Sequence, residues 1–483
     1  MLRTLSHTTP PPGAVQCYGI KCYNAPAMLR PLIWLPVQVW RGRLAPWERT
    51  FWAVWVARLL ASLGFSFAFP LLPLYIQYLG VRDSAEAAAW AGALSAGSAL
   101  SMGLAAPLWG TLADRHGRKL MLQRALFSGA VLITLMGLAP NVQVLFGLRV
   151  VQGLFTGVVT AATVLVTSQV PRDRLASSLG LLSVGTFIGT SAGPFVGGLI
   201  ADTLGFRTSF FLTGVMLLLG GLIVTFGVRE QFTPPAHAQE SARGPGGVLR
   251  ATLSSLALLR EGGLASVIAV TFLVHLGTMV VSPVLPLYIQ QLSGSEQFVA
   301  STAGGIAAGT AMVSALSAVF VGRLADRVGH RRILVVCTLL AGLLYLPQGL
   351  ARSPLELLVL RAAMALFLGG VLPTANALIA VLAPEHRRGA FYGLMQTVSS
   401  LGSVIGPVAG ATVAATFGLH AVFFVTGSIL IAVGGWAALA IRPVQQEAVV
   451  EGQAAPVMAL AEQGGGATRP TALEQGRRHA GRG

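Results

Sequence analysis

The sequence predicts an all-α membrane protein with twelve transmembrane helices in two six-helix bundles related by a pseudo-twofold axis. Three observations support this fold class. The chain is 54% hydrophobic and only 10% charged, whereas about a quarter of the residues of soluble domains are charged. Apolar stretches recur along it at the length of about 20 residues that a span requires. A short charged loop between such stretches is written twice, which indicates an internal duplication.

The chain divides into two bundles, at residues 49–228 and 263–441, joined by a polar linker at 229–262. We expect residues 1–48 to form a tail with an interfacial segment, with Met28 as an alternative start, and 442–483 to form a disordered tail. Within the linker, Val248–Leu259 is expected to form a surface helix. The expected spans are 50–79, 88–110, 120–139, 142–169, 176–203, 208–228, 263–291, 299–321, 333–350, 355–382, 389–417 and 420–441.

The distribution of charge predicts the topology. The formal net charge is +16, yet only Arg82, Arg207 and Arg352 fall in loops on one side of the expected bundles. The basic residues of the other loops and of the tails share the opposite side, so both termini are expected in the cytoplasm, with the chain in the inner membrane. This alternation argues against nucleic-acid binding, which needs a contiguous basic surface. Three cysteines cannot form a disulfide framework, and we expect no metal site.

The duplicated loop reads G-T-L-A-D-R-H-G-R-K at Gly110–Lys119 and G-R-L-A-D-R-V-G-H-R at Gly322–Arg331. Its glycines are expected to permit a tight turn and close backbone approach. Three further anchors repeat in the same order. They are Pro70–Gln77 with Pro283–Gln290, Arg149 with Arg361, and Gly189-x3-Gly193-Pro194-x2-Gly197 with Gly402-x3-Gly406-Pro407-x2-Gly410. The repeat therefore covers both bundles.

These residues resemble the major facilitator superfamily over about residues 49–441. The charged loop resembles its motif between spans two and three, Arg149-x2-Gln152-Gly153 its fourth-span motif, and Gly189–Gly198 its antiporter motif. The Pro-Gly motif of both halves is similar to that of bacterial multidrug-efflux members. The resemblance implies a monomer in the lipid bilayer that exports lipophilic small molecules by alternating access. It implies exchange for protons, with the proton gradient as energy source and no cofactor.

The resemblance also implies that the charged loops form a gate. Asp114 would meet the start of span eleven near Arg387 and Arg388, and Asp326 would meet the start of span five near Arg172 and Arg174. The alternative is that the loops only set the topology. The candidate gating residues are Gly110, Asp114, Arg115, Gly117, Arg118, Lys119, Gly322, Asp326, Arg327 and Arg331.

Span four is expected to carry one polar stripe, formed by Arg149, Gln152, Gly153, Thr156, Gly157 and Thr160 at helical spacing. The resemblance gives Arg149, Gln152 and Gly153 a role in proton coupling, and the alternative is a structural arginine bonded to carbonyl groups. Since the acidic residues fall in tails, loops or helix ends, the titratable candidates for carrying the proton are His275, Asp202 at the outer end of span five, and Asp114. The alternative for His275 is a hydrogen-bonded packing residue. Arg361 lacks the stripe and is expected to be structural. Arg58 and Arg124 are expected to extend to the membrane surface.

Span five carries a row of small residues that predicts tight helix packing. The resemblance makes this face, and its counterpart in span eleven, the interface with the opposite bundle. The residues of this interface motif are Gly185, Gly189, Gly193, Pro194, Gly197, Gly198, Gly402, Gly406, Pro407 and Gly410. Aromatic and small polar residues suit a cavity for lipophilic substrates, although each can also pack between helices. The cavity candidates are Phe65, Tyr75, Thr156, Thr160, Thr190, His275, Met279, Asn376 and Gln396.

Other functions fit the sequence less well. An ATP-driven pump needs a G-x4-G-K-[ST] loop, and neither Lys21 nor Lys119 follows a glycine. An intramembrane hydrolase would need an H-E-x-x-H signature, which does not occur, or a G-x-S-x-G signature between a strand and a helix. The one G-x-S-x-G match, Gly189–Gly193, falls inside the expected fifth span, so we expect no enzymatic activity. A porter for a sugar or small metabolite on the same fold is the remaining alternative, and a non-transporting receptor also stays open.

Overall fold

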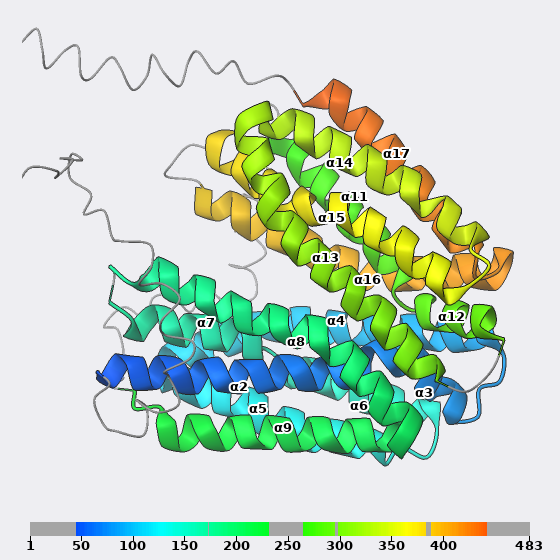
Figure 1. Ribbon diagram of the computed structural model, residues 1–483. Coiled ribbons are helices and arrows are strands. Elements are labelled where there is room, and N and C mark those ends of the chain that lie inside the picture. Colours follow the sequence, from blue (N-terminus) through cyan, green and yellow to red (C-terminus); the bar gives the residue numbers. More distant parts are fainter. Residues whose placement is uncertain (1–44, 172, 231–263, 295–297, 383–387, 442–483) are drawn as a thin grey trace, which may run out of the picture.

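The computed structural model describes residues 45–171, 173–230, 264–294, 298–382 and 388–441, and these form two bundles of helices without a strand. Figure 1 shows the bundles as separate bodies that meet at one end, with the element order of the first repeated in the second. The all-α prediction is confirmed. Most of the predicted tails and of the linker, with its surface helix, lies outside the described residues. Residues 46–48, expected in the N-terminal tail, instead begin the first helix, and Arg229 and Glu230 of the linker are described.

The first bundle begins with a broken first span and then continues with long helices. Its elements are α2 (Pro46–Ala68), η2 (Phe69–Leu71), α3 (Leu72–Tyr78), α4 (Ser84–His116), α5 (Arg118–Gly137), α6 (Val142–Phe155), α7 (Val158–Gln169), α8 (Leu175–Leu204) and α9 (Phe206–Gly227). The break after Ala68 precedes Pro70 and Pro73, which provide no backbone N–H and therefore favour the end of a helix.

The second bundle repeats this order at an offset of about 213 residues. Its elements are α11 (Leu264–Val281), α12 (Leu285–Ser293), α13 (Val299–Val328), α14 (His330–Tyr345), η4 (Pro347–Leu350), α15 (Pro354–Leu382), α16 (Arg388–Phe417) and α17 (Ala421–Ala440). Among the described residues, eleven helical segments are long and apolar enough to cross a membrane. The twelfth is α4, which has the length but is rich in Ala, Ser and Gly. The chain is therefore a multi-pass membrane protein, as predicted.

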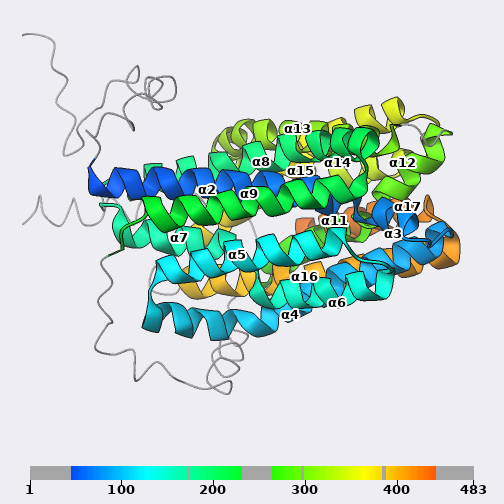
Figure 2. The same cartoon turned by 90° about the horizontal axis from the view of Figure 1, so that it is seen from below.

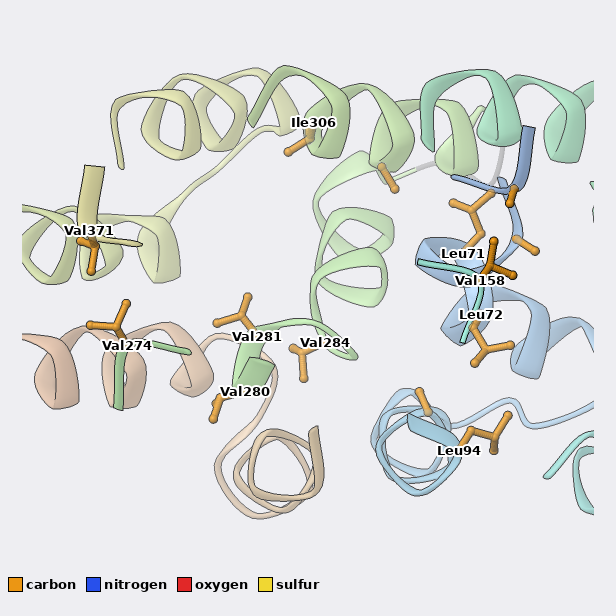
Figure 3. Close-up of a cluster of buried hydrophobic side chains, with 14 of the residues drawn as sticks. Leu71, Leu72, Leu94, Val158, Val274, Val280, Val281, Val284, Ile306 and Val371 are labelled. Carbon is orange, nitrogen blue, oxygen red and sulfur yellow. The ribbon is translucent and has the colours of Figure 1, made fainter. Parts of the chain in front are cut away.

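Buried apolar side chains fill each bundle and also the junction between them. Figure 3 labels members from both halves, including Leu71 and Leu72 at the break in the first span and Val284 at the corresponding break in the seventh. Leu71 is 2% exposed and Val284 is fully buried. The break in the first span and the corresponding break in the seventh are both buried where the bundles meet. The contact between the bundles therefore follows the internal pseudo-twofold symmetry.

The two bundles touch at one end only. We call the end at which α9 ends and α11 begins the linker end, and the opposite end the far end. The contacts between the halves are made chiefly by α8 with α13 and by α4 with α16, which lie side by side in Figures 1 and 2. A methyl group at Gly92, near the far end of α4, would lie 2.7 Å from the carbonyl of Pro407. Nothing lies within 4 Å of such a group at Gly103 or Gly322, nearer the linker end.

Candidate functional site

The charged loops form one-residue turns at the linker end. Gly117 (φ +95°) separates α4 from α5, and Gly329 (φ +105°) separates α13 from α14. Few other residues adopt this backbone conformation, so a glycine is required at each turn. Gly110 and Gly322, expected to contribute to the turn, instead lie inside α4 and α13 with open space around them. The helices continue past them because glycine does not end a helix on its own.

The basic residue two positions after each turn glycine binds carbonyl groups at the end of a neighbouring helix. Lys119 Nζ donates to the carbonyls of Thr225 (2.9 Å) and Val228 (2.6 Å) at the end of α9. Arg331, at the equivalent position, donates through Nη2 to the carbonyl of Ala438 near the end of α17 (2.5 Å). Cations are favourable at a helix C-terminus, where carbonyl groups lack partners. These two residues therefore join the first and last turns of helices within their own half.

Glu230 caps the start of α5 in the first half. Its carboxylate accepts from the backbone N–H groups of Arg118 (3.1 Å) and Lys119 (2.7 Å). These amides belong to the first turn, which has no partner inside the helix. The sequence analysis missed this role of Glu230. The available signal was an acidic residue directly after the sixth span. Arg115 and Arg327 are exposed.

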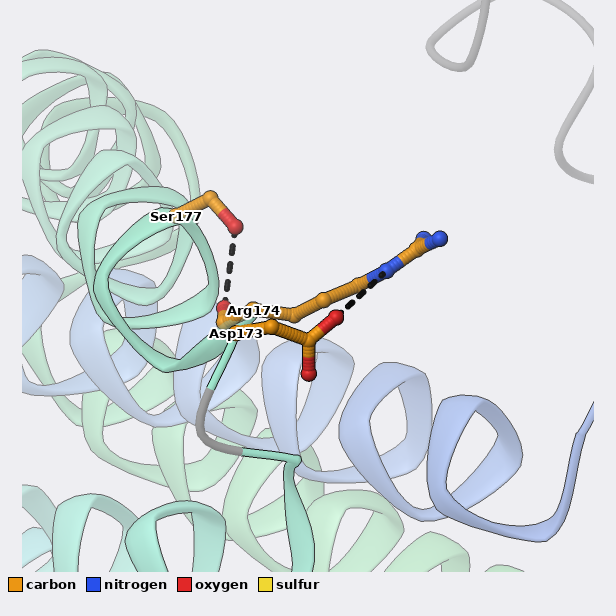
Figure 4. Close-up of polar contacts among 3 residues, drawn as sticks. All are labelled: Asp173, Arg174 and Ser177. Carbon is orange, nitrogen blue, oxygen red and sulfur yellow. Dashed lines mark hydrogen bonds and ion pairs between the residues drawn. The ribbon is translucent and has the colours of Figure 1, made fainter. Parts of the chain in front are cut away.

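The predicted pairing of the gate carboxylates is not formed among the described side chains. Asp326 is exposed and pairs with His330, at 3.2 Å between Oδ1 and Nε2. At the start of α8, Arg174 lies 3.9 Å from the carboxylate of its neighbour Asp173, as Figure 4 shows. The side chains of Arg174 and Asp173 are 60% and 77% exposed. The side chains of Asp114 and Arg388, and all of residue 387, lie outside what the structure describes.

Arg149 lies at the centre of a half-buried polar and aromatic cluster. Its guanidinium donates through Nη1 to Gln152 Oε1 (2.8 Å) and lies over the ring of Phe69, 3.7 Å from the centroid. Phe69 stacks on Phe65 with ring centroids 5.4 Å apart. The Arg149 Nε is buried without a partner. An arginine bonded to a neutral amide and an aromatic face retains unused hydrogen-bonding capacity.

Span four is interrupted in the middle, which corrects the prediction of one continuous stripe. α6 ends at Phe155 and α7 begins at Val158, with Gly157 at φ +129° between them. Gln152 and Gly153 are buried before the break, whereas Thr160 is exposed after it. Gly153 packs so closely against Ser98 and Ser101 of α4 that a side chain there would overlap them. Periodicity alone did not indicate the break, because glycine is also common within membrane helices.

Arg124 and Arg58 lie on either side of this break. Arg124 donates through Nη2 to the carbonyl of Thr156 (3.3 Å) and stacks on Trp109, 3.4 Å from the ring centroid. Arg58 is only 7% exposed and donates to Thr186 Oγ1 (2.8 Å) and to the carbonyl of Val159 (3.1 Å). The prediction that both extend to the membrane surface is wrong. Carbonyl groups left free by the interrupted helix provide them with nearer acceptors.

In the second half, Arg361 and His275 have separate surroundings. Arg361 donates through Nη1 to Oε1 of Gln348, which is fully buried in η4 (3.4 Å). His275 Nε2 and Ser403 Oγ are 2.9 Å apart, which joins α11 to α16. The half-buried histidine also packs against Gly402, 3.1 Å from where a methyl group would stand. Neither residue has an aromatic partner like that of Arg149 among the ring contacts of the described residues.

The glycine rows of spans five and eleven face helices of their own half. A methyl group at Gly189 would lie 2.5 Å from Ser62 Cβ of α2, and one at Gly406 would lie 2.5 Å from Met279 Cβ of α11. The same holds along both rows, at Gly185, Gly193 and Gly197 against α2 and at Gly402 and Gly410 against α11. The prediction that these rows meet the opposite bundle is wrong.

The residues that do cross to the opposite bundle lie one position later in the same motif. Gly198 packs against Ala300 of α13, the carbonyl of Pro194 against Gly304, and the carbonyl of Pro407 against Gly92 of α4. One position is a rotation of about 100° around a helix. The motif therefore has two packing faces, one towards its own half and one towards the opposite half. The sequence analysis treated the residues of both faces as one face.

The cavity candidates fall into three groups. Tyr75 is fully buried and its hydroxyl donates to the carbonyl of Met136 (3.0 Å), so it ties the first span to the third and does not line a cavity. Phe65, Thr156, Met279 and Asn376 are half-buried, and Thr160 and Thr190 are exposed. The side chain of Gln396 lies outside the described residues. No metal-binding group of three His, Cys, Asp or Glu residues occurs in the described part of the chain.

Known proteins with similar sequences and structures identify the family. The chain matches the Major Facilitator Superfamily over residues 54–311 and 267–462. It is 35% identical to the multidrug resistance protein MdtG of Dickeya zeae over 384 residues, which cover 80% of this chain and 92% of that protein. It is 34% identical to MdtG of Escherichia coli over 402 residues, 83% of this chain and 97% of the relative.

Solved structures support the same fold. A bacterial homologue of the human lysosomal transporter Spinster, in an inward-facing and occupied conformation, matches with a TM-score of 0.67 at 16% identity, over 83% of this chain and 97% of that one. The nucleoside transporter NupG matches with a TM-score of 0.66 at 12% identity, over 82% and 100%. At these identities the likeness concerns the fold alone. With two helical bundles, the repeated charged turns and close relatives of nearly full length, the chain belongs to the Major Facilitator Superfamily.

Proposed function

We propose that this protein is a secondary active transporter that exports lipophilic small molecules, including drugs, by alternating access. The observation that carries this proposal is the 35% identity to a multidrug resistance protein, MdtG of Dickeya zeae, over 92% of that relative. Two bundles that touch at one end and separate at the other are the geometry that alternating access requires. The transporter would act as a monomer in the inner membrane, without enzymatic chemistry.

The charge distribution supports a cytoplasmic location for the linker end. Arg115, Arg118 and Lys119 lie at this end, whereas Arg82, Arg207 and Arg352 lie at the far end. The first group continues with Arg323, Arg327, Arg331 and Arg332 in the second copy of the loop. Positive residues remain on the cytoplasmic side during insertion. In this orientation, the structure is open towards the cytoplasm and closed outside.

Proton entry would supply the energy. No acidic residue lies near the middle of a described span, so the coupling must involve other groups. The unused hydrogen-bonding capacity of Arg149, its bond to Gln152 and its contact with Phe69 support a part for this cluster. His275 is the second candidate, because its ring joins α11 to α16 and because histidine can change its charge near neutral pH.

Transport in proteoliposomes tests this function. Purified protein is reconstituted, a pH gradient is imposed, and the movement of lipophilic dyes is compared with that of sugars and nucleosides. We expect gradient-dependent dye movement that an ionophore abolishes. Gradient-dependent movement of a sugar or nucleoside without dye movement would favour the alternative, a metabolite porter on the same fold, and would contradict drug export.

Asp114 would close the gate at the linker end by meeting the start of α16 when the halves approach there. Asp114→Asn tests this role, because the amide keeps the size of the side chain and removes its charge. We expect normal insertion and loss of export. Asp173→Asn is the matched control, since Asp173 is exposed at the same end and pairs with its neighbour Arg174. Normal export by Asp114→Asn would contradict the gating role.

A further inference from the structure

One carboxylate crosses between the halves at the far end. Asp202 lies in the last turn of α8, and its two oxygens accept from the backbone N–H groups of Ala300 (3.2 Å) and Ser301 (2.7 Å). Both amides belong to the first turn of α13 in the other half. The first four amides of a helix have no acceptor within it, so Asp202 satisfies two of them from outside the bundle.

The start of α13 has no cap from its own N-cap residue. That residue is Phe298, which has a positive φ of 60° and makes no capping hydrogen bond. The equivalent helix of the first half, α4, is capped by its own Asp83, whose carboxylate accepts from Glu86 N at 2.8 Å. The position equivalent to Asp202 in α16 is Ala415, at the offset of 213. The contact therefore occurs on one side of the pseudo-twofold axis only.

The surrounding contacts are close and made by backbone. Gly198 packs against Ala300, and Gly304 packs against the carbonyl of Pro194, so closely that a side chain at either glycine would overlap its neighbour. Close backbone packing of this kind holds α8 and α13 together without polar contacts. When the two helices separate, however, the first amides of α13 lose their acceptor. The bonds to Asp202 break in the same movement, because they join the same two helices.

We propose that Asp202 is the latch of the far end, a gate residue that holds the halves together there and must release α13 before that end opens. In the seam between α4 and α16 the equivalent residue is Ala415, whose side chain cannot accept a hydrogen bond, so the opening of the two seams differs. The latch favours the state in which the linker end is open, and its loss shifts the population towards the opposite state.

A cysteine in the second seam reports this equilibrium. Ala411 is 4% exposed on α16, and its Cβ lies 2.9 Å from where a methyl group at Gly92 would stand. Ala411→Cys is introduced with Cys17, Cys22 and Cys337 replaced by alanine, and the purified full-length protein is reacted with a maleimide. The thiol is reached when the far end opens. The labelling rate depends on neither substrate nor proton coupling, so failure of the latch and failure of the proposed transport are distinguishable.

Asp202→Ala should raise the labelling rate about tenfold, because two charge-assisted hydrogen bonds are lost. Asp202→Asn, whose amide oxygen can still accept one bond, should give an intermediate rate, and Asp202→Glu should approach the parental rate. Asp83→Ala is the matched control, because it removes a helix cap within one half. A parental rate in both Asp202→Ala and Asp202→Asn, or an equal rise in Asp83→Ala, would overturn the proposal. If Asp202→Ala does not fold, the near-isosteric Asp202→Asn decides alone.

Discussion

The two halves make the same contacts at their helix ends but differ in the charged side chains that they bury. Both use a glycine turn after a long helix and a basic residue bonded to the end of the last helix of the bundle. In both, a tyrosine also bonds the end of the third span of its own half. Among the described residues, the first half buries or half-buries Arg58, Arg124 and Arg149 within its spans. In the second half Arg361 lies within a span, and the half-buried Arg331 lies beside the charged turn, as its counterpart Lys119 does in the first half.

This difference separates architecture from function. Because the halves have the same fold, a contact present in both serves the fold, and a contact present in one serves a task that this half does alone. Tyr75 and Tyr288 belong to the first class, and the cluster of Arg149, Gln152 and Phe69 belongs to the second. Four substitution experiments test this separation.

The largest effect is expected at Arg149. Arg149→Ala should lower gradient-driven transport about 10- to 100-fold, because a hydrogen bond to a charged group contributes about 1.5–3 kcal/mol. Arg361→Ala should leave transport per folded molecule within about threefold and should lower the thermal midpoint instead, because its bond to Gln348 fixes a helix end. Proteoliposome transport and thermal unfolding of both variants would show this. Loss of transport in Arg361→Ala, with normal transport in Arg149→Ala, would contradict the assignment of this function to the first half.

His275 tests whether the second half shares in proton coupling. His275→Gln keeps the size and can still bond Ser403, but it cannot titrate. If the histidine carries the proton, gradient-driven transport falls at least about tenfold. Counterflow of substrate without a gradient stays near the parental rate. Equal rates of gradient-driven transport in the variant and the parent would make His275 a packing residue.

The glycine rows should respond equally in both halves. Gly197→Ala and Gly410→Ala would each place a methyl group on the backbone of a neighbouring helix, at Phe67 and at Val280. We expect each to destabilise the protein by about 1–3 kcal/mol, as overpacking does. Gly103→Ala, in open space on α4, is the control and should be neutral or slightly stabilising. Thermal unfolding in detergent measures all three, and a strong effect in one half only would contradict the symmetry.

The smallest effect is expected at the paired tyrosines. Tyr75→Phe and Tyr288→Phe each remove a hydroxyl that donates to a carbonyl at 3.0 Å, at Met136 and at Gln348. Each change should cost about 1 kcal/mol in stability. Tyr78→Phe, at a tyrosine that is 56% exposed, should change little. An altered range of transported substrates in Tyr75→Phe without loss of stability would restore this residue to the substrate cavity.

The sequence was sufficient to predict the all-helical fold, the duplication and most span boundaries. Hydropathy and the positive-inside pattern depend on single helices, which a linear sequence describes well. The turn at Gly117 could be predicted for the same reason, because its cause is local.

The relations between helices could not be predicted in the same way. The row from Gly185 to Gly197 was assigned to the wrong neighbour, because periodicity identifies a face but not what covers it. Asp202 was recognised as titratable, yet its acceptor role needs α13 beside it, about 100 residues later in the chain. Tyr75 seemed to be a cavity residue because an aromatic ring suits either place until its hydroxyl finds a carbonyl.

The interruption of span four has a consequence for the electric field inside the first bundle. α6 and α7 are consecutive and meet at Thr156 and Gly157, so the negative pole of one half-helix faces the positive pole of the next. Arg124 binds the carbonyl of Thr156 and offsets the negative pole. The positive pole of α7 is then left uncompensated by any acidic side chain among the described residues of these two half-helices. The break therefore adds a local positive potential to the interior of the first bundle, where the guanidinium groups of Arg58 and Arg124 also lie.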